Sequence, residues 1–234
     1  MRAISKTSFV EALRNWDVSN VAAALDQRPE FVSLLDNAKR TPLHICASRT
    51  VLATMKSTAA IATVKVLLEA GADIDTVQPI RDDGELFPAT ALWYSLAWGQ
   101  HRALASYLLK RKANPNNCMF ALVYADDLIS AKLVRRYGAK IDEVFAGETP
   151  LIYAVRHSRA KFAEWLLKEG ANPNFRDRRG LSALHHAVRR RLPVATLQAL
   201  QKAGADTQAV SKDGVSVAKL ATRAQNKVLG LNDV

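Results

Sequence analysis

The chain has 234 residues, of which 49% are hydrophobic, and it carries a formal net charge of +11 at pH 7. This length and apolar content exclude a disordered tail and allow a substantial core. The first residues lack the apolar run of a secretory signal, and no stretch approaches the roughly 18 to 20 apolar residues that span a bilayer. We therefore expect a cytoplasmic protein without a membrane segment.

The first predicted elements are two helices, over residues 8–16 and 18–35, which would form an N-terminal unit. Thr41 then opens the sequence "TPLH", in which a Thr hydroxyl caps a helix start and the following proline suits the first helical position. A second helix follows and ends at Gly71. Glycine has no Cβ and so adopts the left-handed conformation of a helix end without strain. The pattern predicts a unit of two short helices closed by glycine.

The same unit recurs at an average spacing of about 33 residues, a period typical of solenoids. Its second helix ends before a repeated alanine, and glycines at positions 138, 170 and 204 take the place of Gly71. Its first helix starts at a capping residue. The predicted N-caps are Thr41, Thr90, Asn117, Thr149, Ser182 and Ser216.

Three departures interrupt this pattern. About nine residues are added around positions 50–60, and about seven around Val77 to Pro88, where Asp-Asp-Gly predicts the turn of a longer β-like finger. Lys112 replaces the expected glycine and would have to adopt the left-handed conformation. The apolar surroundings of Cys46 and Cys118 predict two buried, reduced thiols.

The segments "TPLHICA", "VKVLLEAGADID", "ETPLIYAV" and "SALHHAV" resemble the ankyrin repeat, and the resemblance covers residues 17–227. It implies an all-α solenoid of stacked helix-turn-helix units joined by β-like finger loops. We expect one domain over residues 1–234, ending in a single capping helix. Its expected parts are 1–39 (N-terminal cap), 40–88, 89–116, 117–147, 148–180, 181–213 and 214–234 (C-terminal cap).

No pattern of catalytic residues is recognisable. The resemblance implies that His44 and His185 are hydrogen-bonding spacers, and Asp126 with Asp127 is read as a solvated turn rather than an acid–base pair. Neither a metalloprotease helix nor a phosphate-binding glycine loop occurs. We expect no enzyme activity, no cofactor and no metal. Three further histidines lie in no recognisable triad: His101, His157 and His186.

Positive charge is concentrated in the C-terminal half, where residues 118–234 hold 19 Lys and Arg against 11 Asp and Glu. It forms clusters at 156–161, 176–179 and 189–191. The resemblance implies that the first and last lie at the ends of consecutive first helices, and the middle one in a finger toward the opposite edge. Basic residues near helix C-termini are also stabilised by the helix dipole, and they keep a protein soluble. The clusters alone therefore do not establish a ligand.

The resemblance implies an adaptor or scaffold that binds another protein through its concave face and fingers, and we expect a monomer. The charge favours an acidic partner, with a polyanion or nucleic acid as the alternative. Trp98 is either an anchor for the partner or a core residue. The candidate binding residues are Arg81, Asp82, Asp83, Trp98, His101, Arg102, Arg156, His157, Arg159, Arg176, Arg178, Arg179, Arg189, Arg190 and Arg191.

Overall fold

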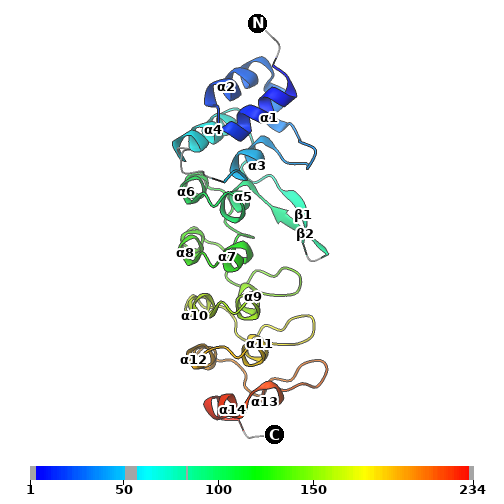
Figure 1. Ribbon diagram of the computed structural model, residues 1–234, viewed down its shortest axis with the longest axis vertical. Coiled ribbons are helices and arrows are strands. Elements are labelled where there is room, and N and C mark those ends of the chain that lie inside the picture. Colours follow the sequence, from blue (N-terminus) through cyan, green and yellow to red (C-terminus); the bar gives the residue numbers. More distant parts are fainter. Residues whose placement is uncertain (1–3, 51–56, 83, 232–234) are drawn as a thin grey trace. The chain divides into compact units, whose positions relative to one another are not determined.

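A computed structural model describes residues 4–50, 57–82 and 84–231 (Figure 1). The chain forms two compact units, one with residues up to 121 and 136–138, the other with residues 122–135 and those from 139 onward. Within the described residues the fold is helical apart from one antiparallel hairpin and isolated bridges, which confirms the expected fold class. Most of the inserted segment at 50–60, and Asp83, lie outside the described residues.

The first unit is built from helix pairs whose equivalent members pack on each other. Helices α1, α3 and α5 form one row, and α2, α4 and α6 form the other (Figure 1). The expectation of one helix over residues 18–35 is wrong: α2 ends at Gln27, and a separate 3-10 helix, η1, begins at Pro29, whose missing N–H interrupts the α-helix. The bounds are α1 Lys6–Asn15, α2 Val18–Gln27, η1 Pro29–Ser33, α3 Pro42–Ala47, α4 Ser57–Glu69, α5 Ala91–Ala97 and α6 Arg102–Lys110.

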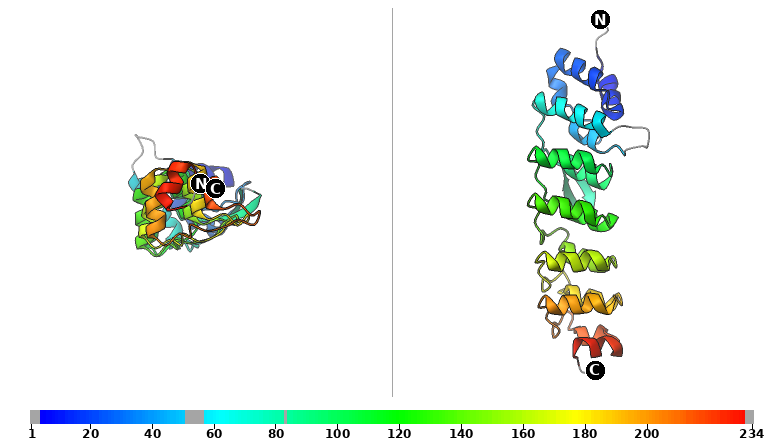
Figure 2. Two further views of the ribbon diagram at one scale, coloured as in Figure 1. Left: turned by 90° about the horizontal axis from the view of Figure 1, so that it is seen from below. Right: turned by 90° about the vertical axis from the view of Figure 1, so that its left-hand side faces the viewer.

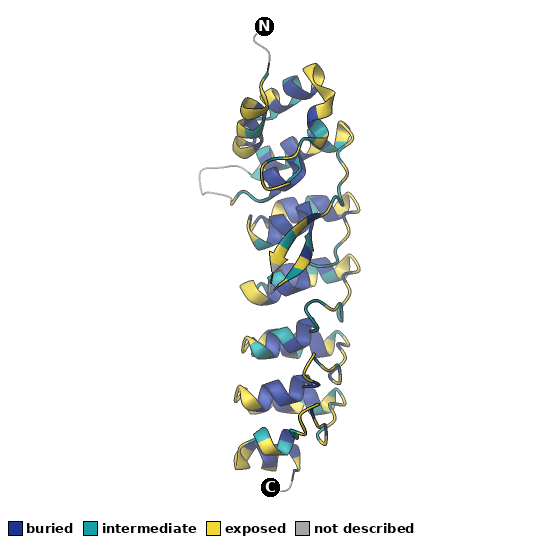
Figure 3. Ribbon diagram, turned by 90° about the vertical axis from the view of Figure 1, so that its right-hand side faces the viewer, coloured by how far each residue is buried: buried dark blue, intermediate teal, exposed yellow. Residues whose placement is uncertain are grey.

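The predicted long finger is a hairpin of strands β1 (Gln78–Asp82) and β2 (Glu85–Ala89). Burial alternates along β2, as expected of a strand with one face on the core (Figure 3). Phe87 is 3% exposed and its ring centre lies 5.4 Å from that of Trp93. The Gln78 side chain donates to the carbonyl of Ala38 at 2.8 Å, so the hairpin is anchored to its own unit.

The second unit repeats the same arrangement, with α9 against α10 and α11, α10 against α12, and α12 against α14. Successive helix pairs lie in layers (Figure 2). The bounds from the middle of the chain onward are α7 Met119–Ala125, α8 Leu128–Arg136, α9 Pro150–Arg156, α10 Ala160–Lys168, α11 Ala183–Arg189, α12 Val194–Lys202, α13 Val217–Leu220 and α14 Arg223–Leu229.

Capping residues start five of the six first helices where the sequence predicts them. Thr90, Thr149 and Ser216 accept from backbone amides, and Thr41 and Ser182 form capping boxes with a histidine three residues on. The prediction for Asn117 is wrong: it has a φ of 64°, and α7 begins two residues later. An N-cap needs extended backbone, so a left-handed residue does not fit that role.

The helix ends also follow the sequence. Gly71, Gly138, Gly170 and Gly204 have φ between 86° and 93°, and Lys112 takes their place with a φ of 68°. The left-handed lysine is therefore confirmed. Both cysteines are buried and form no disulfide, as predicted, and burial raises the pKa of the Cys46 thiol.

The single C-terminal capping helix is a wrong prediction, because the segment folds as α13 and α14. The backbone is extended at Ala221 and Thr222. Thr222 forms a capping box with Gln225, in which each side chain satisfies the other residue's backbone N–H. A polar capping residue inside an apolar pattern therefore starts a new helix here.

Candidate functional site

A chain of aromatic rings runs from the hairpin to the end of α5 in the first unit. Ring centres are 5.4 Å apart for Phe87 and Trp93, 5.9 Å for Trp93 and Trp98, and 4.9 Å for Tyr94 and Trp98. Trp98 is 50% exposed at the end of this chain. One part of the ring therefore packs within the unit and the rest faces solvent, so the role of Trp98 as an anchor for a partner stays a prediction.

His101 does not belong to an exposed surface, contrary to its selection as a binding candidate. It is 2% exposed, and its Nδ1 accepts the N–H of Leu104 at 3.1 Å to cap α6. Burial lowers the pKa of His101, which favours the neutral ring that this acceptor role requires. Its neighbour Arg102, the first residue of α6, is exposed.

The outer face of the hairpin carries Arg81 opposite Leu86, which is 62% exposed. Asp82 is the last residue of β1. Pro79 and Pro88 are also opposite each other and supply no N–H donors. Proline on both strands limits pairing with an added strand, so the hairpin offers side chains rather than a free backbone edge.

The finger cluster of the second unit links successive fingers. Arg176 donates to the carbonyl of Val210 at 2.6 Å and lies 3.8 Å from the carboxylate of Asp206. Arg179 lies 3.8 Å from Asp213. Arg178 packs in the other direction, over the backbone of Gly147, where an added Cβ would collide with its side chain. These three arginines therefore already have contacts within the repeats.

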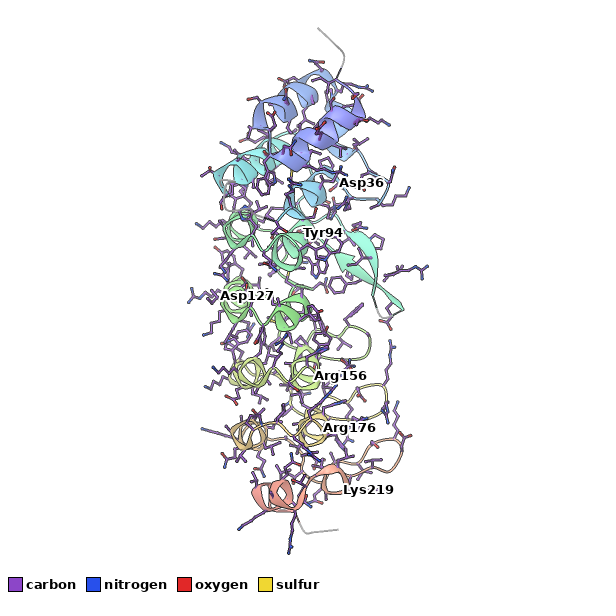
Figure 4. All side chains as sticks on the ribbon, in the orientation of Figure 1. Asp36, Tyr94, Asp127, Arg156, Arg176 and Lys219 are labelled. Atoms are coloured by element: carbon purple, nitrogen blue, oxygen red, sulfur yellow. The ribbon has the colours of Figure 1, made fainter. Side chains whose placement is uncertain are left out.

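The first-helix cluster contains both paired and unpaired arginines. Arg156 forms an ion pair with Glu148, and Arg159 donates to the carbonyl of Tyr124 at 2.8 Å and lies 3.7 Å from Asp126. Figure 4 marks Arg156 and Arg176, which belong to neighbouring layers of the second unit. By contrast, the exposed arginines 189–191 form no ion pair or side-chain hydrogen bond with any residue that the structure describes.

Aromatic rings lie beside these arginines. The ring of His157 is 4.3 Å from that of Tyr153 and 6.2 Å from that of Tyr124, which is 65% exposed. The sequence analysis missed both tyrosines; their only signal is their place in the last turns of first helices. We call the following set the basic-aromatic surface: Tyr124, Tyr153, Arg156, His157, Arg159, Arg189, Arg190 and Arg191.

Positive charge from three of these arginines acts on one imidazole, that of His157. Burial lowers the pKa of His157, and the charges of Arg156, Arg159 and Arg190 lower it further. Burial likewise lowers the pKa of His186, while Asp177 opposes this effect and Arg156 acts in the same direction as burial. Arg156 of α9 thus acts on both imidazoles, while Arg159 and Arg190, which follow α9 and α11, act on that of His157.

His186 and the paired aspartates have structural contacts instead of catalytic ones. The Nε2 of His186 lies 2.8 Å from the carboxylate of Asp177, and both side chains are almost completely buried. Asp127 caps α8 by accepting the N–H of Ser130 at 3.0 Å, and Asp126 is an exposed left-handed residue in the preceding turn. These contacts connect a finger to its helix and one helix to the next.

Neither a metal site nor a membrane-spanning helix occurs among the residues that the structure describes. No group of three or more His, Cys, Asp or Glu side chains is arranged there to hold a metal ion. None of the helices in this part of the chain is long and apolar enough to cross a bilayer.

Residues 51–177 and 119–211 match the family model of ankyrin repeats (3 copies). Because these ranges cover more than half of the sequence, the chain belongs to the ankyrin repeat family. The ankyrin repeat domain of Bcl-3, a member of the IkappaB protein family, has a TM-score of 0.76 and 22% identity over 95% of this chain and 97% of its own. That of human ASB11 has a TM-score of 0.66 and 20% identity, over 97% of each chain.

Sequence relatives are much longer proteins. The Arf-GAP with coiled-coil, ANK repeat and PH domain-containing protein 2 of Gallus gallus is 27% identical over 188 residues, which cover 78% of this chain and 23% of the relative. The phosphocholine transferase AnkX of Legionella pneumophila is 33% identical over 146 residues, covering 57% of this chain and 15% of the relative. The chain therefore spans less than a quarter of the length of these two proteins.

Proposed function

We propose that the chain binds an acidic protein partner through the basic-aromatic surface and catalyses no reaction. Ankyrin repeats generally mediate protein–protein interactions. The observation that carries the finer proposal is the run of exposed arginines 189–191, which have no ion-pair partner among the described residues. Their charge is available to a ligand, whereas Arg176 and Arg179 are occupied by the next finger.

Physical chemistry favours a carboxylate-bearing partner for this surface. An arginine guanidinium binds a carboxylate through two parallel hydrogen bonds, and complementary charge accelerates association. Tyrosine and arginine are also the side chains that most often dominate the energy of protein interfaces. A surface kept only for solubility would not require the exposed ring of Tyr124 beside the arginines.

The enzyme names of the relatives are not extended to this chain. They belong to proteins of which it matches 15% and 23% of the length. We propose a monomeric binding module located in the cytoplasm, in which the exposed Trp98 and the hairpin residue Arg81 add contacts outside the basic-aromatic surface. This proposal for Trp98 rests on its half-exposed ring.

The proposal is tested by affinity capture from a lysate with and without nuclease treatment, followed by titration of the captured protein after purification. The triple variant R189Q/R190Q/R191Q is compared with the wild-type chain. A charge-matched control replaces Lys6, Arg14 and Lys110 by Gln; these residues are exposed and form no ion pair with the described residues.

We expect wild type and control to bind the same acidic protein and the triple variant to bind it at least about tenfold more weakly. Equal affinity of all three proteins would contradict the proposed surface. Capture that disappears with nuclease would instead indicate a nucleic-acid ligand. The melting temperatures of the variants should stay close to that of the wild type, because exposed unpaired charges contribute little stability.

A further inference from the structure

We infer that the basic-aromatic surface recognises a linear peptide segment in which one aromatic side chain is flanked by acidic residues. This inference rests on the proposed function and adds the chemistry of the bound segment. Its starting point is the shelf of three rings formed by Tyr124, His157 and Tyr153.

The shelf is built by two consecutive repeats within the second unit. Tyr153 and His157 are four residues apart, at the end of α9, and therefore lie on one face of the chain. Tyr124 comes from the last turn of α7 and reaches the same imidazole. Arg159 holds the two segments together through its hydrogen bond to the Tyr124 carbonyl. The rings therefore have fixed neighbours and need little ordering when a ligand arrives.

The exposure of the shelf favours an aromatic ligand group. Tyr124 is 65% exposed although its ring already contacts an imidazole, and His157 is exposed as well. An aromatic side chain that covers these rings would bury apolar area and gain ring–ring contacts. Tyrosine hydroxyls at the edge would keep their hydrogen bonds to water.

Charge around the shelf defines the flanking residues of the ligand. Arg159 donates to the carbonyl of Tyr124, and the charges of Arg156, Arg159 and Arg190 all act on the imidazole of His157. Arginines 189–191 supply the charge that is not already neutralised within the described residues. Carboxylates before and after the aromatic residue of a peptide would therefore meet arginines on both sides.

A nucleic acid fits this surface less well, although bases also stack on aromatic rings. The carboxylates of Asp126 and Glu148 lie within the cluster, where they pair with Arg159 and Arg156. A phosphate backbone with regularly spaced charges would meet these two acids as well as the arginines. A peptide can present neutral residues at those places and acidic residues opposite the unpaired arginines.

The inference is tested by fluorescence anisotropy with the full chain and three labelled probes. One probe is a short peptide of Glu and Asp with a central Trp, the second has Ala in place of Trp, and the third is single-stranded DNA of equal charge. The chain is used as wild type, as Tyr124→Ala, and as the control Tyr137→Ala, which removes another partly exposed tyrosine. The triple variant R189Q/R190Q/R191Q is measured in parallel.

We expect the Trp peptide to bind wild type about five- to tenfold more tightly than the Ala peptide. Tyr124→Ala should abolish this difference without weakening the Ala peptide, whereas Tyr137→Ala should preserve it. The triple variant should weaken both peptides. If wild type binds the two peptides equally, the aromatic part of the inference is refuted and acidic recognition stands. If neither peptide binds, or DNA binds more tightly than both, the inference and the proposed surface both fail.

Discussion

The carboxylate of Asp142 accepts a hydrogen bond from the backbone N–H of Asn172, thirty residues later, at 3.1 Å. The same contact joins Asp75 to Asn114 in the first unit at 2.8 Å. In each pair a polar side chain just after one second helix accepts from the backbone at the equivalent place in the next repeat. These contacts give a physical reason for the similar segments that contain the repeated alanine: "GADID" at 71–75, "GAKID" at 138–142, and "ANPN" at 113–116 and 171–174.

Replacing Asn174 by Ala tests this interpretation. The Asn174 side chain accepts the N–H of Asp206 and donates to the carbonyl of Gly204, each at 2.8 Å. The loss of both bonds should lower the free energy of unfolding by about 1–2 kcal/mol. The measurement is urea denaturation. Gln208→Ala is the control, since only its backbone is hydrogen bonded to the neighbouring aspartate, and equal losses in both variants would contradict the interpretation.

Lys112 offers a test at a helix end. Its φ of 68° places a side chain in the left-handed region. Lys112→Gly should therefore be neutral or raise the free energy of unfolding by up to about 1 kcal/mol. Lys110→Gly, inside the last turn of α6, should instead destabilise by about 1 kcal/mol. Thermal melts distinguish the two, and a clearly lower melting temperature for Lys112→Gly would contradict the strain argument.

Alanine substitutions on the two faces of the hairpin should change the stability of the protein by different amounts. Phe87 is 3% exposed and packs on Trp93, so Phe87→Ala should cost about 3–4 kcal/mol. Leu86 is 62% exposed, and Leu86→Ala should change stability by less than about 0.5 kcal/mol. Chemical denaturation measures both. Similar losses would mean that the register of the hairpin is different.

The sequence was sufficient for features that depend on neighbouring residues. Thr149 and Ser216 cap helices, and Lys112 adopts a positive φ, because local chemistry decides these conformations. The sequence was insufficient for contacts that a residue makes with another repeat. The sequence alone could not indicate that Arg176 meets an acid thirty residues later, while Arg190 meets none among the described residues.

Burial limited the prediction of the candidate site in the same way. His101 is a polar residue near a helix start, and only the packed structure reveals that its ring caps α6 in the interior. Tyr124 and Tyr153 lie in apolar helical patterns and were passed over, because periodicity does not reveal which ring remains exposed at a helix end. The domain boundaries expected within residues 1–234 stay predictions.

Acidification should destabilise the fold. The five histidines have pKa values lowered from 6.5, mainly by burial, so the unfolded chain binds protons more readily than the folded one. The stability that the neutral histidines contribute above about pH 6.5 is therefore lost as the pH falls below 6.5 toward the lower pKa values of the folded chain. Urea denaturation between about pH 7.5 and pH 5.5 should show a falling midpoint. A rising midpoint would contradict these directions.

The most direct test of the proposed interaction surface is amide hydrogen exchange of the full chain with and without the acidic Trp peptide. We predict slower exchange at the end of α9 and in residues 157–160, and at the end of α11 with residues 190–192, where the ligand covers the helix ends. Exchange in the finger at 175–180 should stay unchanged, since its arginines already contact the neighbouring fingers. Protection confined to that finger or to the hairpin, with none at the ends of α9 and α11, would contradict the account.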